Sequence, residues 1–153
     1  MMAEAKLEHI CSYTVDLKPP EVIGPTPEGF RVIFYVAGGI ISGPRLKGTV
    51  EPAGADWLII RPDGIGRVDV RATLKTDDGA LIYAAYTGLL DLGEDGYEKF
   101  LAGNPPLNFP IRAAPCFQTA HPSYTWLNRL QCLNIGTVDL PSSRVSYDVF
   151  AVS

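Results

Sequence analysis

An aspartate and an arginine two residues apart, Asp69 and Arg71, are the first side chains in this sequence that could do chemistry. They lie in RVDVRATLKT (67–76), where apolar and polar residues alternate as in a β-strand with one buried face. Alternate residues of a strand share a face, so Arg71 can keep the Asp69 carboxylate ionised or hold a substrate oxygen. Such a pair suits an acid–base site, but it is also a common solvent-exposed ion pair.

The segment ALIYAAYTGLL (80–90) predicts the second strand of a hairpin, after a turn at residues 77–79, and it is nearly all apolar. A two-residue turn would pair Arg71 with Tyr86, whereas a three-residue turn with a glycine bulge would place Tyr83 on the face of Arg71. The sequence leaves both registers open. An apolar strand beside a charged face indicates either a cavity with a few polar groups or an apolar surface buried elsewhere, for example between subunits of a homo-oligomer.

A second informative segment is HPSYTWLNRLQCLNIG (121–136), of which residues from 125 onward are predicted to form a strand. On a strand, Tyr124, Trp126 and Asn128 share one face. Trp126 is predicted to lie in the core, and Asn128 beside it would then be a buried amide that needs partners or contacts a ligand.

A third segment, GADWLIIRPDG (54–64), predicts a strand that places Trp57 and Arg61 on the same face. Asp56 stands at the start of this strand. It is either a turn residue or a functional carboxylate, and the pattern alone does not decide between them.

The elements that must position these residues are short strands separated by turns rich in glycine and proline, of which the chain has 15 and 13. Strands are expected over nine segments: 9–17, 30–41, 45–52, 56–62, 67–76, 80–90, 109–119, 125–139 and 144–152. One short helix is expected within 93–106, where acidic residues precede an apolar face and Gly103 follows it. Glycines within strand patterns favour a closed barrel over a sandwich, and the whole chain, 1–153, is predicted to be one all-β domain.

Composition excludes several classes of function. A net charge of −4 argues against nucleic-acid binding, and no apolar run is long enough to cross a membrane as a helix. Three cysteines without a C-x-x-C pair, and no apparent signal peptide, predict a cytoplasmic protein without disulfides. His9 and His121 belong to no cluster with ligand spacing, and no nucleotide loop is present, so neither a metal nor an organic cofactor is predicted.

Taken in order, four segments resemble one family: GGIISGPRLKGTVEPAGADW, RPDGIGRVDVRATLKTDDGALIYAAYTG, APCFQTAHPSYTWLNR and VSYDVFAV. Together they are similar to the DUF3237 / UPF0311 family of small uncharacterised β-barrel proteins, from about residue 30 to 152. The resemblance implies a single antiparallel β-barrel, similar in shape to lipocalin-like small-ligand barrels. Its motif positions correspond here to Asp56, Trp57, Arg61, Asp69, Arg71, Tyr83, Thr119, Trp126, Asn128 and Arg129.

Because alternate side chains point into a barrel, the resemblance favours an inward position for the Asp69–Arg71 pair. The function then expected is a cofactor-independent isomerase, hydratase/lyase or cyclase acting on a small, partly apolar carbonyl compound. Asp69 or Asp56 would be the base, and Asp56 is the better one if Arg71 lowers the pKa of Asp69. The oxyanion and substrate contacts would come from Arg71, Arg61, Arg129, Trp57, Tyr83, Tyr86, Thr119, Tyr124, Trp126 and Asn128.

Two other functions fit the same pattern. One is a carrier or sensor barrel that binds a small molecule without turnover. The other is a structural module whose interior is filled by side chains, in which case Asp69 and Arg71 face water.

Overall fold

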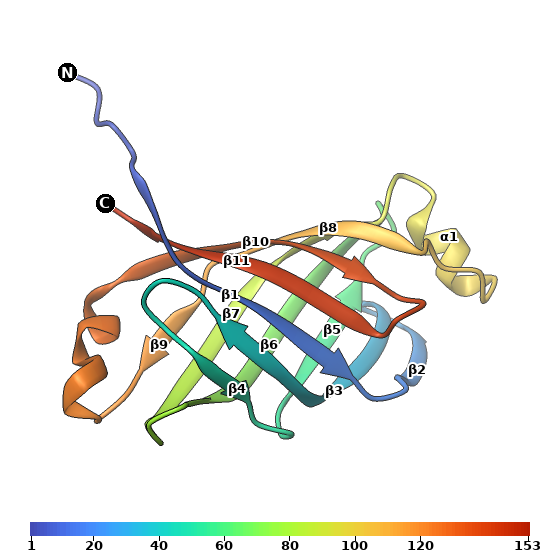
Figure 1. Cartoon of the computed structure of the whole chain (residues 1–153). Coiled ribbons are helices and arrows are strands. Elements are labelled where there is room, and N and C mark those ends of the chain that lie inside the picture. The colour runs from blue at the N-terminus through green and yellow to red at the C-terminus, as the bar shows by residue number, and fades with distance from the viewer.

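Eight strands hydrogen-bond in a closed circle, in the order β6-β5-β3-β1-β11-β10-β8-β7 and back to β6, and every pairing is antiparallel. The computed structural model in Figure 1 describes all residues from 1 to 153. The strands of the circle are β1 (Leu7–Leu17), β3 (Gly29–Ser42), β5 (Ala55–Ile60), β6 (Ile65–Thr76), β7 (Leu81–Asp91), β8 (Asn108–Ala113), β10 (Gln131–Asp139) and β11 (Arg144–Val152). The predicted all-β barrel is therefore confirmed.

Alternation decides which side chains fill the barrel. In β6, Val68, Val70 and Leu74 are buried, while Arg67 and Lys75 are exposed. Each strand of a small barrel repeats this arrangement, because successive residues point to opposite sides of the wall. The barrel interior is consequently built from apolar residues of all eight strands.

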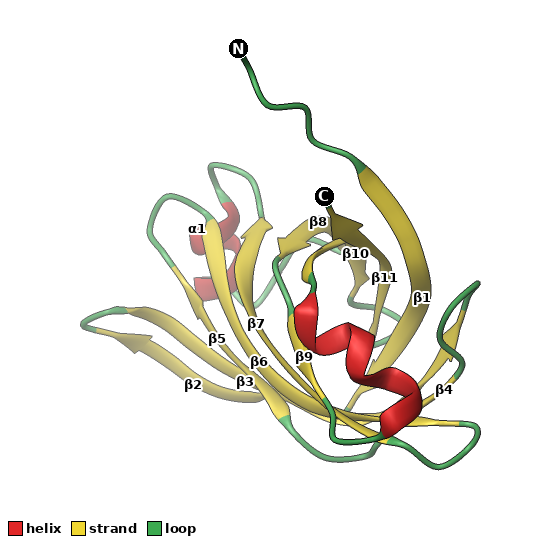
Figure 2. Ribbon diagram, turned by 90° about the vertical axis from the view of Figure 1, so that its left-hand side faces the viewer, coloured by secondary structure: helices red, strands yellow, loops and turns green.

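The two ends of the barrel differ. The helix α1 (Gly96–Leu101) lies at one end and the 3-10 helix η1 (Pro122–Arg129) at the other, as Figures 1 and 2 show. Leu127 of η1 is only 1% exposed and packs in the core, so the η1 end is filled by side chains. Open space inside the barrel lies towards the α1 end.

Three short strands extend the circle. β2 (Glu21–Thr26) pairs only with β3, β4 (Gly48–Val50) bridges β3 and β6, and β9 (Cys116–Gln118) pairs with β7. β2 was not expected, because Gly24 and Pro25 read as turn residues. An edge strand tolerates both, since its outer side needs no backbone donor.

Two predicted strands need correction. Residues 122–129 form η1, so the strand expected over 125–139 begins only at Gln131. Pro122 at the first turn and the ring nitrogen of His121, which accepts a hydrogen bond from the Ser123 amide, favour a helical start here. The strand expected over 109–119 is split into β8 and β9 by Ala114 and Pro115.

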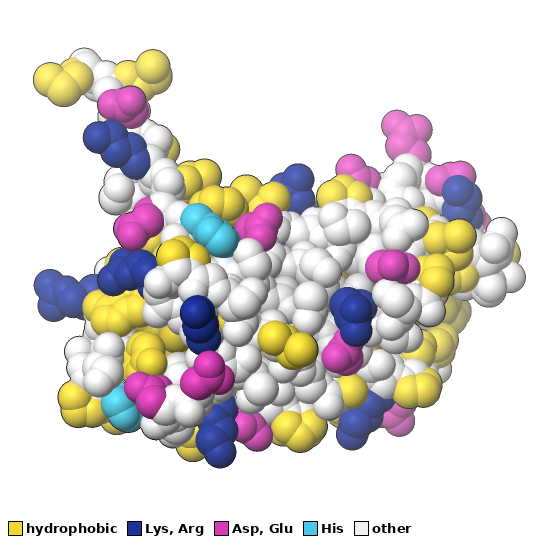
Figure 3. All heavy atoms as spheres, in the orientation of Figure 1, with side chains coloured by type: hydrophobic (Ala, Val, Ile, Leu, Met, Phe, Trp, Pro, Cys, Tyr) yellow, Lys and Arg dark blue, Asp and Glu magenta, His cyan; other side chains and the backbone are white.

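On the face shown in Figure 3, charges of both signs are interspersed, without a large patch of either. All three cysteines are free thiols. Neither helix has the length and hydropathy needed to cross a membrane.

Candidate functional site

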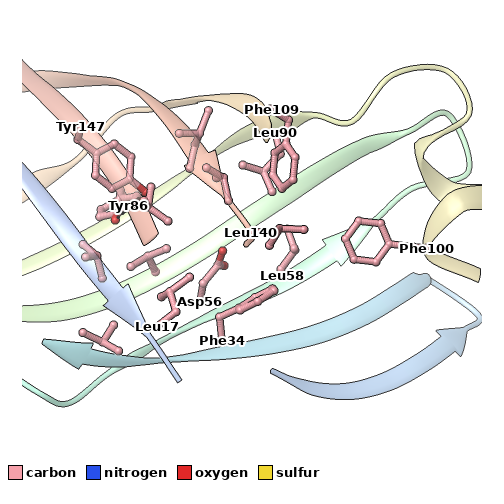
Figure 4. A pocket seen from close by; sticks show the side chains of 16 residues that line it. Leu17, Phe34, Asp56, Leu58, Tyr86, Leu90, Phe100, Phe109, Leu140 and Tyr147 are labelled. Atoms are coloured by element: carbon pink, nitrogen blue, oxygen red, sulfur yellow. Dashed lines mark hydrogen bonds between the residues drawn. The ribbon is translucent and has the colours of Figure 1, made fainter. Parts of the chain in front are cut away.

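An apolar cavity occupies the barrel interior towards α1 (Figure 4). Fifteen of its 16 lining residues are hydrophobic, and the cavity is narrow, with a volume of about 40 Å³. The lining residues are Val15, Leu17, Phe34, Val36, Asp56, Leu58, Val70, Tyr86, Leu90, Phe100, Phe109, Ile111, Val138, Leu140, Val145 and Tyr147. Asp56 is the one charged side chain among them.

Asp56 reaches the cavity because of its place in β5. It alternates with Leu58 and Ile60, which are both buried, and Figure 4 shows its carboxyl group pointing from the strand into the cavity. The small surface that Asp56 leaves exposed faces this space. An inward carboxyl group on a barrel strand is costly unless it is hydrogen-bonded or protonated.

The backbone pairing between β5 and β6 is interrupted next to Asp56. The amide of Asp69 donates to Oδ1 of Asp56 at 3.0 Å, and the carbonyl of Trp57 accepts from the Arg31 guanidinium at 2.7 Å. The paired residues accordingly skip from Asp56↔Val70 to Ile59↔Arg67. Side chains thus replace part of the backbone ladder, and this fixes one oxygen of Asp56.

Burial raises the pKa of Asp56 from 3.8 to about 7. This value already includes three smaller effects: the hydrogen bond from the Asp69 amide and the positive charge of Arg31 lower the pKa, and the negative charge of Asp69 raises it. A carboxyl group with a pKa near 7 exists in both forms at neutral pH, so it can both accept and return a proton.

Three buried tyrosines, Tyr13, Tyr86 and Tyr147, cluster beside Asp56, and their hydroxyls take part in two hydrogen bonds. Nδ2 of Asn134 donates to the Tyr13 hydroxyl at 2.8 Å, and the Tyr86 hydroxyl donates to that of Tyr147 at 3.1 Å. The ring of Tyr13 packs on the ring of Tyr147, with 5.0 Å between the centroids, which brings the two pairs together. Within the second pair Tyr86 is the donor and Tyr147 the acceptor, so Tyr86 does not use the Tyr147 proton. The proton of Tyr147 is left for a ligand in the cavity.

All three tyrosines remain protonated. Burial is the largest cause that raises the pKa of Tyr13, Tyr86 and Tyr147 well above 10, and the charge of Asp56 adds to it for Tyr86 and Tyr147. They can therefore act as neutral hydrogen-bond donors. A donor of this kind in an apolar site stabilises negative charge that develops on a substrate oxygen.

A glycine makes room for Tyr147. Gly136 of β10 faces Tyr147 across the strand pair, and a Cβ atom at this position would lie 2.9 Å from Cδ1 of the Tyr147 ring. The same Cβ would also clash with the carbonyl oxygen of Ser146, so any larger residue would displace the β10–β11 backbone as well as the ring. Gly136 thus lets the two strands approach closely at Tyr147.

The Asp69–Arg71 pair lies outside the cavity, contrary to the prediction. The turn has three residues with Gly79 at φ +92°, and it pairs Thr73 with Tyr83 and Arg71 with Ala85. This register puts Tyr83 on the face of Arg71, as one alternative proposed, but Val68 and Val70 occupy the inner side of β6. Asp69 and Arg71 are 48% and 54% exposed, with 3.8 Å between Oδ1 and the guanidinium.

Trp57, Tyr83 and Arg61 also lie away from the cavity. Trp57 is on the outer face of β5, 5.7 Å below the Arg71 guanidinium, and Tyr83 is 42% exposed on the outer face of β7. Arg61 binds both carboxylate oxygens of Asp63 in the turn that follows β5. Their expected inward position is wrong because each stands one residue out of phase with the buried set.

The residues of the second informative segment hold the η1 end together. The amide group of Asn128 accepts from the backbone N–H of Thr119 at 2.8 Å and donates to its carbonyl at 2.9 Å. Tyr124 donates to Asp78 at 2.9 Å, and the ring of Trp126, only partly buried, lies 3.9 Å from the Arg45 guanidinium. These side chains and the exposed Arg129 lie at the end opposite the cavity, so they do not meet Asp56.

Of the sequence-predicted site residues, Asp56 and Tyr86 line the cavity together. Sequence reasoning missed Tyr147, Tyr13 and Asn134. A signal was present for Tyr147, because RVSYDVFAV alternates cleanly and places Tyr147 in phase with Val145 and Val149. No three His, Cys, Asp or Glu side chains lie close enough together to hold a metal ion.

These features define an eight-stranded antiparallel β-barrel with an apolar internal cavity. The sequence profile of DUF3237, a family described as a protein of unknown function, matches residues 5–152. The chain therefore belongs to the DUF3237 family. Among its relatives, a UPF0311 protein of Rhodopseudomonas palustris strain TIE-1 is 31% identical over 154 residues, covering 99% of both chains.

Solved structures share the fold. A β-barrel-like protein from Acinetobacter baumannii AYE is 31% identical, with a TM-score of 0.84 and coverage of 100% of this chain and 99% of that one. A protein with unknown function from Clostridium acetobutylicum has a TM-score of 0.87 at 27% identity, covering 98% of this chain and 100% of its own. A more distant neighbour, described as an enzyme from Penicillium herquei, has a TM-score of 0.74 at 21% identity, covering 100% and 98%.

Proposed function

We propose that the barrel is a cofactor-independent acid–base enzyme that acts on a small, largely apolar carbonyl compound. Asp56 is the proton acceptor and donor, and Tyr147, supported by Tyr86, donates a hydrogen bond to the carbonyl oxygen. No arginine or lysine lines the cavity, so an anionic substrate would find no counter-charge there. The substrate is accordingly uncharged.

The observation that carries this proposal is one carboxyl group, with a pKa raised to about 7, facing an otherwise apolar cavity beside the hydrogen-bonded hydroxyls of Tyr86 and Tyr147. In such a site, ionised Asp56 removes a proton from the carbon next to the carbonyl. The electron pair moves to the oxygen, where the Tyr147 proton stabilises it. Protonated Asp56 then returns the proton to the same carbon or to another one.

Return of the proton to a different carbon is an isomerisation. In dehydration the β-hydroxyl leaves as water with the proton that Asp56 took up, and hydration is the reverse, with water as the reactant. If a hydroxyl of the same molecule adds in place of water, its proton goes to Asp56, the α-carbon is protonated in turn, and a ring closes. All three outcomes need only the proton transfer and the oxyanion donor. The enzyme from Penicillium herquei is consistent with catalysis in this fold, but its 21% identity supports the fold alone.

The test is deuterium exchange. A panel of uncharged ketones and enones is incubated in D₂O with the wild-type protein, with Asp56→Asn and with Asp69→Asn, and deuterium uptake next to the carbonyl is followed by NMR. We expect exchange above the uncatalysed rate for wild type and Asp69→Asn, and the uncatalysed rate for Asp56→Asn. Equal exchange by wild type and Asp56→Asn would overturn the proposal.

A second function, a carrier without turnover, is favoured by the 15 hydrophobic residues of the lining. Native mass spectrometry of the protein from its own source, followed by denaturing extraction, separates the two. A co-purifying compound that remains unchanged on long incubation, without deuterium exchange, would identify a carrier.

A further inference from the structure

An apolar groove lies outside the barrel, at the α1 end. It is formed by the inner side of the β2–β3 hairpin, the segment that follows α1, and the turn between β10 and β11, and its volume is about 360 Å³. Pro20, Val22, Phe30 and Val32 line the hairpin side, and Gly103 and Pro105 line the opposite side. No charged residue faces this groove.

The groove and the internal cavity share three side chains, Phe34, Phe100 and Leu140. Figure 4 shows Phe100 reaching in from α1 at the mouth of the cavity, with Phe34 and Leu140 further inside. The Phe100 ring also packs on Phe30, with 5.8 Å between ring centroids. The same side chains thus line the cavity on one side and the groove on the other, so the two spaces adjoin at Phe34, Phe100 and Leu140.

The β2–β3 hairpin keeps an apolar side chain in the groove that the barrel itself does not bury. Val22 pairs with Val32, which is 1% exposed, yet Val22 is 60% exposed. The pairing shifts between Val22 and Gly24, which leaves Ile23, also 60% exposed, out of register and outside the groove lining. β2 therefore extends the inner apolar surface of β3 beyond the barrel.

We infer that the groove binds an apolar, uncharged extension of the same molecule whose carbonyl group enters the cavity. The ligand is an elongated compound with its one polar group at or near one end, for example a carbonyl carrying an alkyl or isoprenoid-like chain. This inference rests on the proposed function for the position of the carbonyl group. The groove contributes affinity through apolar contact, and Asp56 and Tyr147 contribute the chemistry.

A homologous series of 2-alkanones, from 2-pentanone to 2-undecanone, tests the inference. Dissociation constants are measured by calorimetry for wild type, Val22→Asp and the matched control Ile23→Asp, with circular dichroism to verify folding. Each added CH₂ that becomes buried should tighten binding about fourfold, which corresponds to about 0.8 kcal/mol. Val22→Asp should raise the dissociation constant of 2-undecanone at least tenfold and change that of 2-pentanone by less than twofold. Ile23→Asp should change neither dissociation constant.

The groove and the proposed reaction can fail separately. Dissociation constants that do not depend on chain length would contradict ligand binding in the groove but not the proposed reaction. An equal loss of affinity in Ile23→Asp and Val22→Asp would have the same meaning. Chain-length dependence that Val22→Asp removes, in a protein that exchanges no deuterium into any ketone, would support the groove and overturn the reaction. No binding of any alkanone by wild type would overturn both.

Discussion

The hydroxyl of Tyr86 donates a hydrogen bond to the hydroxyl of Tyr147, 3.1 Å away, although 61 positions separate the two residues along the chain. Tyr86 is on β7 and Tyr147 on β11, and β8 and β10 lie between these strands in the sheet. The bond therefore crosses the barrel interior. Because Tyr86 supplies the proton, Tyr147 keeps its own proton for the cavity.

Loss of the Tyr147 hydroxyl should slow the proposed reaction without unfolding the protein. Removing one oxyanion donor from an active site lowers kcat by about 10²–10³. We expect a loss of this size for deuterium exchange by Tyr147→Phe, and an unchanged rate for the matched control Tyr83→Phe on the outer wall. A full rate in Tyr147→Phe would remove this residue from the mechanism.

The charges of Arg31 and Asp69 should shift the pKa of Asp56 in opposite directions. Arg31 lowers the pKa of Asp56 and Asp69 raises it. If ionised Asp56 is the base, the exchange rate rises with pH around a midpoint near 7. Arg31→Gln should move the midpoint to higher pH and Asp69→Asn to lower pH, as measured in pH–rate profiles. Shifts of the same sign in both variants would contradict this assignment.

Asp56 should make the folded protein less stable as the pH rises. Its pKa is about 7 when folded and near 3.8 when unfolded, so between pH 4 and 7 the folded state binds more protons than the unfolded state. This relation makes stability fall with increasing pH across that window and level off above pH 7. Asp56→Asn removes the dependence and should be more stable than wild type at pH 8, on the order of a few kcal/mol. Urea unfolding at pH 5 and pH 8 measures the free energy of unfolding of both proteins. The same difference between Asp56→Asn and wild type at both pH values would contradict the shifted pKa.

Most strands could be predicted from the sequence because barrel strands are short, alternate and end at glycine or proline. The η1 helix could not, since Tyr124, Trp126 and Asn128 also fit the period of a strand. What decides for a helix is local: Pro122 and the cap at His121, followed by burial of Leu127. β2 was hidden by the same two residues, Gly24 and Pro25, that mark many turns.

The site was only half predictable for a related reason. β5 reads Asp56-Trp57-Leu58-Ile59-Ile60, so apolar residues stand on both faces and the pattern does not tell which face is inside. β6 alternates clearly, and its charged residues face outward as alternation alone would suggest. The expectation that Asp69 and Arg71 turn inward gave too much weight to the apolar β7, whose outer residues Leu81 and Leu89 are simply exposed.

The η1 end should matter for stability and not for the reaction. Asn128→Ala removes the two hydrogen bonds to the Thr119 backbone, at a cost of about 1 kcal/mol each. Urea unfolding should show this loss, while deuterium exchange stays at the wild-type rate. A slower deuterium exchange by Asn128→Ala, at an equal fraction of folded protein, would mean that the η1 end affects the reaction in the cavity.

Because side chains fill the barrel at η1, the cavity is closed at that end, and its entrance is expected at the α1 end, beside Phe100. Substrate would then enter and product would leave through the same entrance. Product should therefore inhibit competitively. The rate of product release would then limit turnover as much as the proton transfer at Asp56.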